Sequence, residues 1–257
     1  MAGAVALFLA AFLASVFGSM VGLGGGFILV PVLRLFFGLG PAEASGTALV
    51  LVVANSASGA FTYLLQKRVH VRLGLLFAAG GWPGSVIGAL ITKHIAPALF
   101  DSLLAVLLVL VALDMVLRRA KDLAERDDST TSVHALRGMH GAGAVAVGFA
   151  VGLVSSLFGI GGGIVLVPTL LYFSDLPAHA ISATSHFGIV LTSPVGLATH
   201  AWQRDILIAD ILPLVAGGLC GGPIGARLSL RLRSPQLLVL VAIALVVGAL
   251  SLVVRHL

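Results

Sequence analysis

The chain has 257 residues, of which 59% are hydrophobic and only 10% are charged. A soluble domain typically carries about 25% charged residues, so this composition excludes an ordinary water-soluble protein and predicts an integral membrane protein. The net charge of +5 would suggest a nucleic-acid partner in a soluble protein. Here the basic residues lie between apolar runs, where they indicate membrane topology, and we expect the lipid bilayer rather than nucleic acid as the partner.

The apolar segments fall into two halves with the same layout, residues 1–117 and 141–257, joined by a polar stretch at residues 118–140. This layout predicts an all-α membrane protein made of two transmembrane repeats with a solvated linker between them. In chain order, the predicted segments are 3–21, 27–39, 43–65, 73–92 and 97–117 in the first half, and 141–158, 164–173, 179–201, 206–228 and 235–254 in the second.

A glycine cluster occurs once in each half. Residues 22–31 have the sequence Gly-Leu-Gly-Gly-Gly-Phe-Ile-Leu-Val-Pro, and residues 159–168 have the sequence Gly-Ile-Gly-Gly-Gly-Ile-Val-Leu-Val-Pro. The apolar segment after each cluster is short: a helix of about 12 residues covers only about 18 Å of a hydrocarbon core that is roughly 30 Å thick. Each cluster is therefore predicted to be the break in a discontinuous or re-entrant helix.

Basic loops predict the orientation of the two halves. Residues 66–72 and 226–234, like the polar linker, are rich in arginine and lysine and are expected to face the cytoplasm. The basic loop precedes segment 73–92 in the first half but follows the equivalent segment, 206–228, in the second. Equivalent segments then cross in opposite directions, which predicts inverted-topology repeats with both chain termini outside the cytoplasm.

The glycine clusters are the first candidates for a binding site. Successive glycines let the backbone leave helical geometry, and the short helix that follows presents unpaired N–H groups and the positive end of its dipole. Such an arrangement binds anions without a charged side chain. The alternative is close helix packing through small residues. The candidate residues are Gly24, Gly25, Gly26, Gly161, Gly162 and Gly163.

Hydroxyl and amide side chains on segments 43–65 and 179–201 form a second set of candidates. They recur at or near helical spacing, so each set lies roughly on one face and can replace the hydration shell of an anion. The alternative is interhelical hydrogen bonding, worth about 0.6 kcal/mol on average. These candidates are Thr47, Asn55, Thr184, Ser185, Thr192 and Ser193.

Two ionisable residues inside or near the spans are further candidates. His186 lies within an apolar run, where it can bind an anion when protonated, carry a coupling proton, or serve as a neutral structural histidine. Arg34, near the end of the first short segment, is either an anion ligand or a side chain that snorkels to the membrane interface. The sequence contains neither a pattern of catalytic residues nor a histidine and cysteine spacing for a metal, so we expect no enzyme, cofactor or metal site.

The paired Gly-x-Gly-Gly-Gly-x-x-x-Val-Pro motifs, each followed by a Pro-Ala…Thr segment, resemble the TauE/SafE sulfite exporter family of DUF81-type permeases. The resemblance extends from about Leu7 to Leu252. It implies a bacterial inner-membrane transporter for small sulfur-containing anions such as sulfite, sulfoacetate or other organosulfonates, bound at the glycine motifs. The second copy departs from the first in having His186 in place of Leu49 and Thr192 in place of Asn55.

Together, these observations predict a secondary transporter that exports small sulfur-containing anions by alternating access. A passive anion channel can use the same residues, and an accessory membrane subunit is the third possibility. The sequence leaves the exact anion, the transport direction, the coupling ion and the oligomeric state open.

Overall fold

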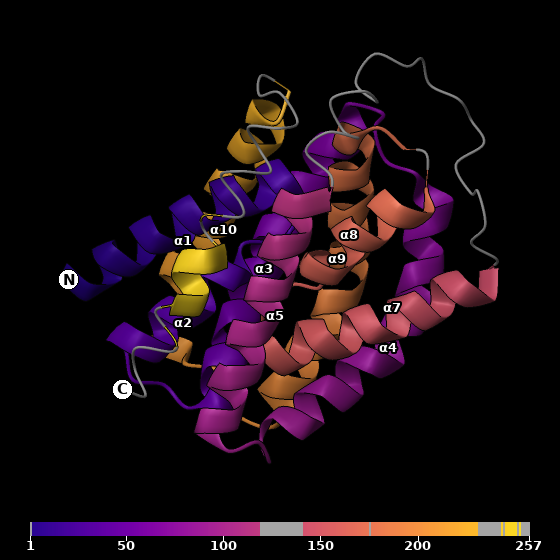
Figure 1. Cartoon of the computed structure of the whole chain (residues 1–257). Coiled ribbons are helices and arrows are strands. Elements are labelled where there is room, and N and C mark those ends of the chain that lie inside the picture. Colours follow the sequence, from indigo (N-terminus) through magenta and orange to yellow (C-terminus); the bar gives the residue numbers. More distant parts are fainter. Residues whose placement is uncertain are drawn as a thin grey trace.

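The computed structural model describes residues 2–118, 141–174, 176–230, 243, 245–250 and 252. These residues form helices and contain no strand (Figure 1). The elements are α1 (Ala2–Val21), α2 (Gly26–Phe36), α3 (Pro41–Leu65), α4 (Val71–Thr92), α5 (Pro97–Arg118), α7 (Gly141–Phe158), α8 (Gly163–Phe173), α9 (Ala178–Trp202), the 3-10 turn η1 (Ile208–Asp210) and α10 (Ile211–Leu228).

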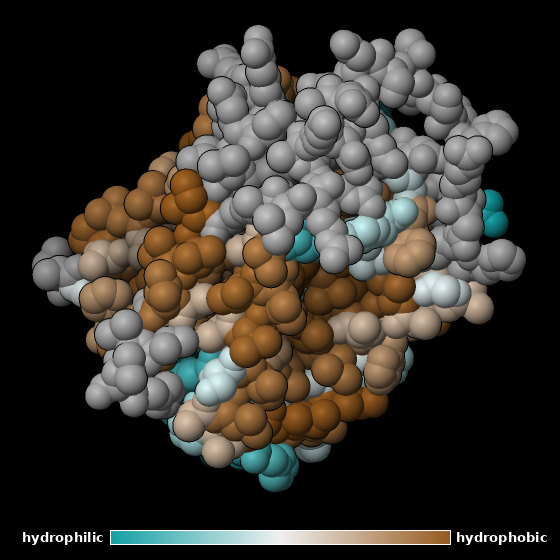
Figure 2. Space-filling model, in the orientation of Figure 1, coloured by the Kyte–Doolittle hydropathy of each residue, from teal (hydrophilic) through white to brown (hydrophobic). Residues whose placement is uncertain are grey.

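In the described part of the chain, seven helices are long and apolar enough to cross a membrane: α1, α3, α4, α5, α7, α9 and α10. Large apolar side chains are exposed along them, and the coloured part of the surface in Figure 2 is mostly hydrophobic, with a few polar patches. Exposed leucines and valines at this density are typical of a lipid-facing surface. The prediction of a multi-pass helical membrane protein is confirmed.

The predicted segments match the helices to within a few residues, with one correction. The segment predicted at 206–228 begins as the 3-10 turn η1, and the α-helix starts only at Ile211. Helices α2 and α8 have 11 residues each, which is too short to cross a bilayer. The polar linker and most of the segment predicted at 235–254 lie outside the described residues.

The two halves of the chain pack into one another rather than side by side. Helix α4 of the first half packs against α7 and α9 of the second, and α10 of the second half packs against α1 and α3 of the first. Figure 1 shows α4 alongside α7. These contacts depend on glycine: Gly80 and Gly84 in α4, like Gly217 and Gly221 in α10, leave no room for a Cβ against the facing helix. Small residues every four positions allow such close approach in membranes.

Helices α3 and α9, which are equivalent in the repeat, run antiparallel to each other. Gly46 near the start of α3 lies against His200 near the end of α9, and Gly59 near the end of α3 lies against His186 near the start of α9. Between them, Gly196 lies against Leu49. Contacts closer to the C-terminus of α3 are therefore made by residues closer to the N-terminus of α9, which means that the two helices are antiparallel.

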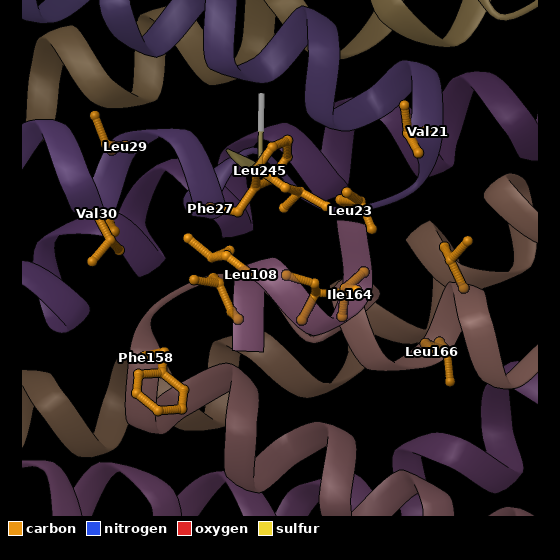
Figure 3. Packing of buried hydrophobic residues seen from close by; sticks show 14 of the residues in the cluster. Val21, Leu23, Phe27, Leu29, Val30, Leu108, Phe158, Ile164, Leu166 and Leu245 are labelled. Carbon is orange, nitrogen blue, oxygen red and sulfur yellow. The ribbon is translucent and has the colours of Figure 1, made fainter. Parts of the chain in front are cut away.

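The apolar core surrounds the two short helices. Leu23 in the first glycine break, Phe27 at the start of α2 and Ile164 at the start of α8 are fully buried in one cluster. Figure 3 shows Leu23 and Ile164 near one another, with Leu108 of α5 alongside. The first turns of α2 and α8 thus meet at the centre of the protein.

Candidate functional site

The two glycine breaks pack directly against each other. A Cβ built on Gly24 would lie 3.5 Å from the Cα of Gly161. Gly26 abuts the backbone of residues 159–160, and its counterpart Gly163 abuts the backbone of residues 22–23. The contacts are reciprocal, so the equivalent residues of the two halves occupy matching positions on either side of the junction.

Left-handed backbone explains why glycine occupies these positions. The φ angles of Gly24 and Gly25 are 87° and 80°, and those of Gly161 and Gly162 are 90° and 64°. Only glycine adopts this region without steric cost. Gly25 and Gly162 are the N-caps of α2 and α8, and neither helix has a side-chain cap. The N-terminal N–H groups and the positive dipole ends of both short helices therefore face the junction.

Apolar side chains close the junction in this conformation. A Cβ on Gly24 would be 3.5 Å from Cγ1 of Val52 and 3.6 Å from Cδ1 of Ile189. Val52 and Ile189 come from the middles of α3 and α9 and are fully buried. The glycine breaks are thus packed as the small-residue alternative expects, and the polar candidates lie beside them.

A polar cluster of three fully buried side chains lies to one side of the junction: Ser19, Asn55 and His186. The Ser19 hydroxyl donates to Oδ1 of Asn55 at 2.7 Å, and its Oγ is 3.1 Å from Nε2 of His186. Since Ser19 has one proton and gives it to Asn55, Nε2 of His186 is the donor in the second contact. This tautomer leaves Nδ1 of His186 as the atom that would take a second proton.

Two atoms of this cluster have no hydrogen-bond partner among the described residues, Nδ2 of Asn55 and Nδ1 of His186. An unpaired buried polar group costs about 1–3 kcal/mol, so its retention calls for an explanation such as a ligand. Ser19 was missed as a candidate, although Gly18-Ser19 precedes the first break as Ser155-Ser156 precedes the second.

The repeat counterpart of the cluster consists of Ser156, Thr192 and Leu49. Thr192 donates back to the carbonyl oxygen of Gly188 at 3.0 Å, and the Ser156 hydroxyl has no partner among the described residues. The Ser193 hydroxyl is also unpartnered within that part of the chain. With leucine in the position of His186, this side forms no equivalent three-residue network.

Three other predicted hydroxyls hold loops and breaks in place. Oγ1 of Thr184 accepts from the backbone N–H of His70 at 3.0 Å, and Oγ1 of Thr47 accepts from that of Leu207 at 3.2 Å. These bonds are equivalent in the repeat, and each fastens a loop of the opposite half. Ser185 donates to the carbonyl oxygen of Gly22 at 2.7 Å, beside the first break.

Arg34 is buried rather than snorkelling. It is 2% exposed, and Nε and Nη2 bind the two oxygens of Asp101 at 2.8 Å and 2.6 Å. Its guanidinium also stacks on Phe100. A bidentate carboxylate partner neutralises the charge and satisfies the donors, which makes burial possible.

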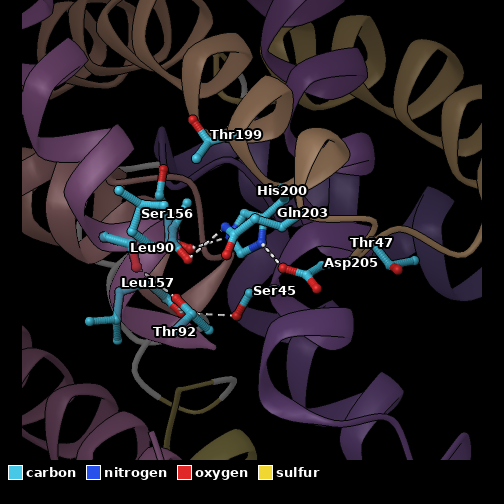
Figure 4. Close-up of polar contacts among 12 residues, drawn as sticks. Ser45, Thr47, Leu90, Thr92, Ser156, Leu157, Thr199, His200, Gln203 and Asp205 are labelled. Carbon is cyan, nitrogen blue, oxygen red and sulfur yellow. Dashed lines mark hydrogen bonds and ion pairs between the residues drawn. The ribbon is translucent and has the colours of Figure 1, made fainter. Parts of the chain in front are cut away.

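A second buried network lies near the end of α9 (Figure 4). Nε2 of His200 is 2.9 Å from the carbonyl oxygen of Ser156, and its Nδ1 is 3.4 Å from Asp205. In the first half, Tyr63 takes the place of His200 and donates to the carbonyl oxygen of Ser19. Both pairs tie a polar residue to the turn just before a glycine break. No group of three metal ligands occurs in the described residues.

Seven apolar helices, two short helices that begin at glycine breaks and a buried polar cluster beside those breaks define a multi-pass membrane protein. The chain belongs to the family described as "Sulfite exporter TauE/SafE", whose model matches residues 7–252. The resemblance predicted from the glycine motifs is thus confirmed.

Several relatives are named as probable membrane transporters. The chain is 30% identical to the probable membrane transporter protein YunE of Bacillus subtilis, with 91% of each chain covered. It is 27% identical to the probable membrane transporter protein YdhB of the same organism, over 86% of this chain and 88% of that one. An 85-residue stretch is 32% identical to the sulfite exporter TauE/SafE family protein 1 of Arabidopsis thaliana, covering 33% of this chain and 19% of that protein. No solved structure matches the chain significantly.

Proposed function

We propose that this protein is a secondary transporter that exports small sulfur-containing anions, such as sulfite or an organosulfonate, across the bacterial inner membrane by alternating access. The family supports the class of substrate. The observation that carries the proposal is the buried cluster of Ser19, Asn55 and His186, with two unpartnered polar atoms, beside the junction of two helix N-termini.

In this proposal the anion binds where the N-termini of α2 and α8 converge. The backbone N–H groups of Gly25, Gly26, Gly161 and Gly162 face its oxygens, and the amide of Asn55 donates a further hydrogen bond. The N–H groups of Gly24 and Gly163 already donate to the carbonyl oxygens of Gly18 and Gly161. The hydroxyls of Thr192 and Ser193 complete the shell from the other half. Helix dipoles and N–H groups favour a negative charge in such a place without a fixed cation, so the substrate can leave as readily as it binds.

His186 gives the site a route to proton coupling. When Nδ1 takes a proton, the ring becomes a cation with a free donor next to the amide of Asn55. A cation there stabilises a bound anion, and loss of the proton releases it. Proton and anion would then move together.

Alternating access follows from the opposed halves. The antiparallel contacts between α3 and α9 and the reciprocal packing of the breaks support inverted repeats, with α2 and α8 as re-entrant helices. The basic loops support a cytoplasmic linker and both termini outside. Val52 and Ile189 close the junction, so a rocking movement of one half against the other opens it to one side at a time.

The test is uptake of labelled sulfite, sulfoacetate and taurine into proteoliposomes that contain the purified protein, with and without a pH gradient. We expect saturable flux that responds to the gradient and is lost on Asn55→Leu. Absence of flux for every small sulfur anion would contradict the proposal. Unitary currents in planar bilayers would make the protein a channel instead.

A further inference from the structure

Arg68 lies in the turn between α3 and α4 with its guanidinium held in a defined orientation. Its Nη1 donates to Oε1 of Gln66 at 2.9 Å, and its Cζ lies 5.6 Å from the centre of the Tyr63 ring. The other two nitrogens, Nε and Nη2, are buried and have no hydrogen-bond partner within the described part of the chain. These two nitrogens form one edge of the guanidinium, and their N–H groups lie side by side and point in the same direction.

The protein itself shows what this edge of an arginine binds. In Arg34, the corresponding Nε and Nη2 hold both oxygens of the Asp101 carboxylate. Arg68 offers the same pair of donors without an acceptor in the described residues. Buried unpaired donors on a cation are costly, and paired oxygens of an anion are the acceptors that fit them best.

Arg68 also leads toward the polar cluster. It stacks on Tyr63, whose hydroxyl donates to the carbonyl oxygen of Ser19 and whose ring meets His186 edge-on at a centroid distance of 5.8 Å. A connected column of side chains therefore joins the α3–α4 turn to the cluster of Ser19, Asn55 and His186.

In the repeat counterpart of this turn, the position equivalent to Arg68 carries the opposite charge. Lys67 and Arg204 occupy equivalent positions with positive φ angles of 55° and 63°, so the two turns have the same backbone form. The next residue is Arg68 in one half and Asp205 in the other. Asp205 faces His200, which replaces Tyr63. Among the described residues of the two turns, only Arg68 has buried guanidinium donors without a hydrogen-bond partner, because Arg204 is exposed.

We propose that Arg68 forms an oxyanion-capture site, in which Nε and Nη2 bind two oxygens of a sulfonate, sulfite or carboxylate group before the ligand moves along Tyr63 to the cluster. This proposal rests on the proposed transport function in one respect: it assumes that the anion bound by Arg68 is the transported substrate. Because both donors are shielded from solvent here, the site fills when the residues around the α3–α4 turn move apart, as alternating access requires.

The experiment measures thermal stabilisation of the purified full-length protein by methanesulfonate, sulfite and acetate. It uses the His186→Leu background, in which the cluster is impaired. We expect a saturable rise in melting temperature. The midpoint, meaning the anion concentration that gives half of the maximal rise, should be at least tenfold higher after Arg68→Gln. Arg72→Gln is the matched control, because Arg72 is an exposed cation four residues further on. Equal midpoints for the two variants would overturn the proposal.

Arg68→Lys separates geometry from charge and replaces Arg68→Gln if that variant does not fold. Lysine keeps the charge but lacks the paired donors, so its midpoint should also rise, and an unchanged midpoint would contradict a bidentate site. A lipid phosphate presents similar oxygens. Stabilisation that depends on Arg68 and appears only with phosphatidylglycerol, and not with soluble anions, would identify a lipid site and overturn the proposal. If anions bind at Arg68 but the protein without substitutions carries no sulfur-anion flux, the transport function alone would be contradicted.

Discussion

The polar cluster beside the first glycine break and its counterpart beside the second are built on the same backbone but differ in chemistry. In both, a serine precedes the break, and a glycine of the facing helix, Gly59 or Gly196, makes room for it. One side continues with Asn55 and His186, and the other with Thr192 and Leu49. The duplicated glycines thus maintain a common scaffold, whereas the side chains that are not duplicated give one side a three-residue polar network with unpartnered buried atoms.

The largest effect is expected at the junction of the two glycine breaks, where the two sides should respond alike. Gly26→Ala and Gly163→Ala each place a methyl group against the backbone of the opposite break, where a neighbouring Cα would be 2.8 Å or 2.6 Å away. The backbone cannot move aside as a side chain can. We therefore expect the free energy of unfolding to fall by more than the about 1–3 kcal/mol of ordinary overpacking, and by a similar amount in the two variants. Yield of monodisperse protein and melting temperature measure it.

Gly38→Ala is the control for these variants. Unlike Gly26 and Gly163, Gly38 has a positive φ, 66°, but a Cβ there would meet no atom within 4 Å. Gly38→Ala should lower the free energy of unfolding by only about 1 kcal/mol, because alanine is less stable than glycine in the left-handed conformation. If Gly26→Ala melted at the temperature of Gly38→Ala, the breaks would not be in contact.

The buried ion pair of Arg34 and Asp101 is a second point of difference, since Leu171 stands at the position equivalent to Arg34. Asp101→Leu leaves a buried guanidinium unpaired and should destabilise the protein by about 3–5 kcal/mol. The double variant with Arg34→Leu and Asp101→Leu should recover much of this loss, because no charge is then left buried. Equal melting temperatures for the single and double variants would contradict this account.

His186→Leu gives the first cluster the leucine of its counterpart. We expect folding to be retained, because a buried leucine already occupies the equivalent position, Leu49, in the other half. Flux should fall at least about tenfold, the equivalent of roughly 1.4 kcal/mol of lost anion stabilisation. Proteoliposome flux and melting temperature are measured together. Leu49→Met is the control in the counterpart position and should transport normally, whereas equal losses in both variants would contradict the functional asymmetry.

The smallest effect is expected at the two loop anchors. Thr47→Val and Thr184→Val each remove one acceptor for a backbone N–H. Because the bonds are equivalent, each change should cost about 1 kcal/mol and the two losses should agree within error. Thermal unfolding of the two variants is the measurement. A clear difference would show that the equivalent loops are not held in the same way.

Helix positions were largely predictable because each apolar run is bounded by glycine, proline or charge. The segment expected at 206–228 was wrong at its start, where residues 208–210 form a 3-10 turn. The chain there is as apolar as the helix that follows, so composition alone does not mark the boundary. Arg34 shows a different limit: its acceptor, Asp101, is 67 residues away, and no local pattern connects the two.

The sequence by itself determined the membrane class, the duplication, the breaks at the two glycine clusters and the family. Each depends on local properties, namely apolar length, the conformational freedom of glycine and a repeated pattern. Only the tertiary structure decided that His186 meets Ser19, 167 residues away, and that the pair lies beside the junction of the breaks. Helical periodicity shows which residues share a face, but the partner of that face depends on long-range packing. That packing brings His186 of the second half against Ser19 of the first half, which also binds Asn55.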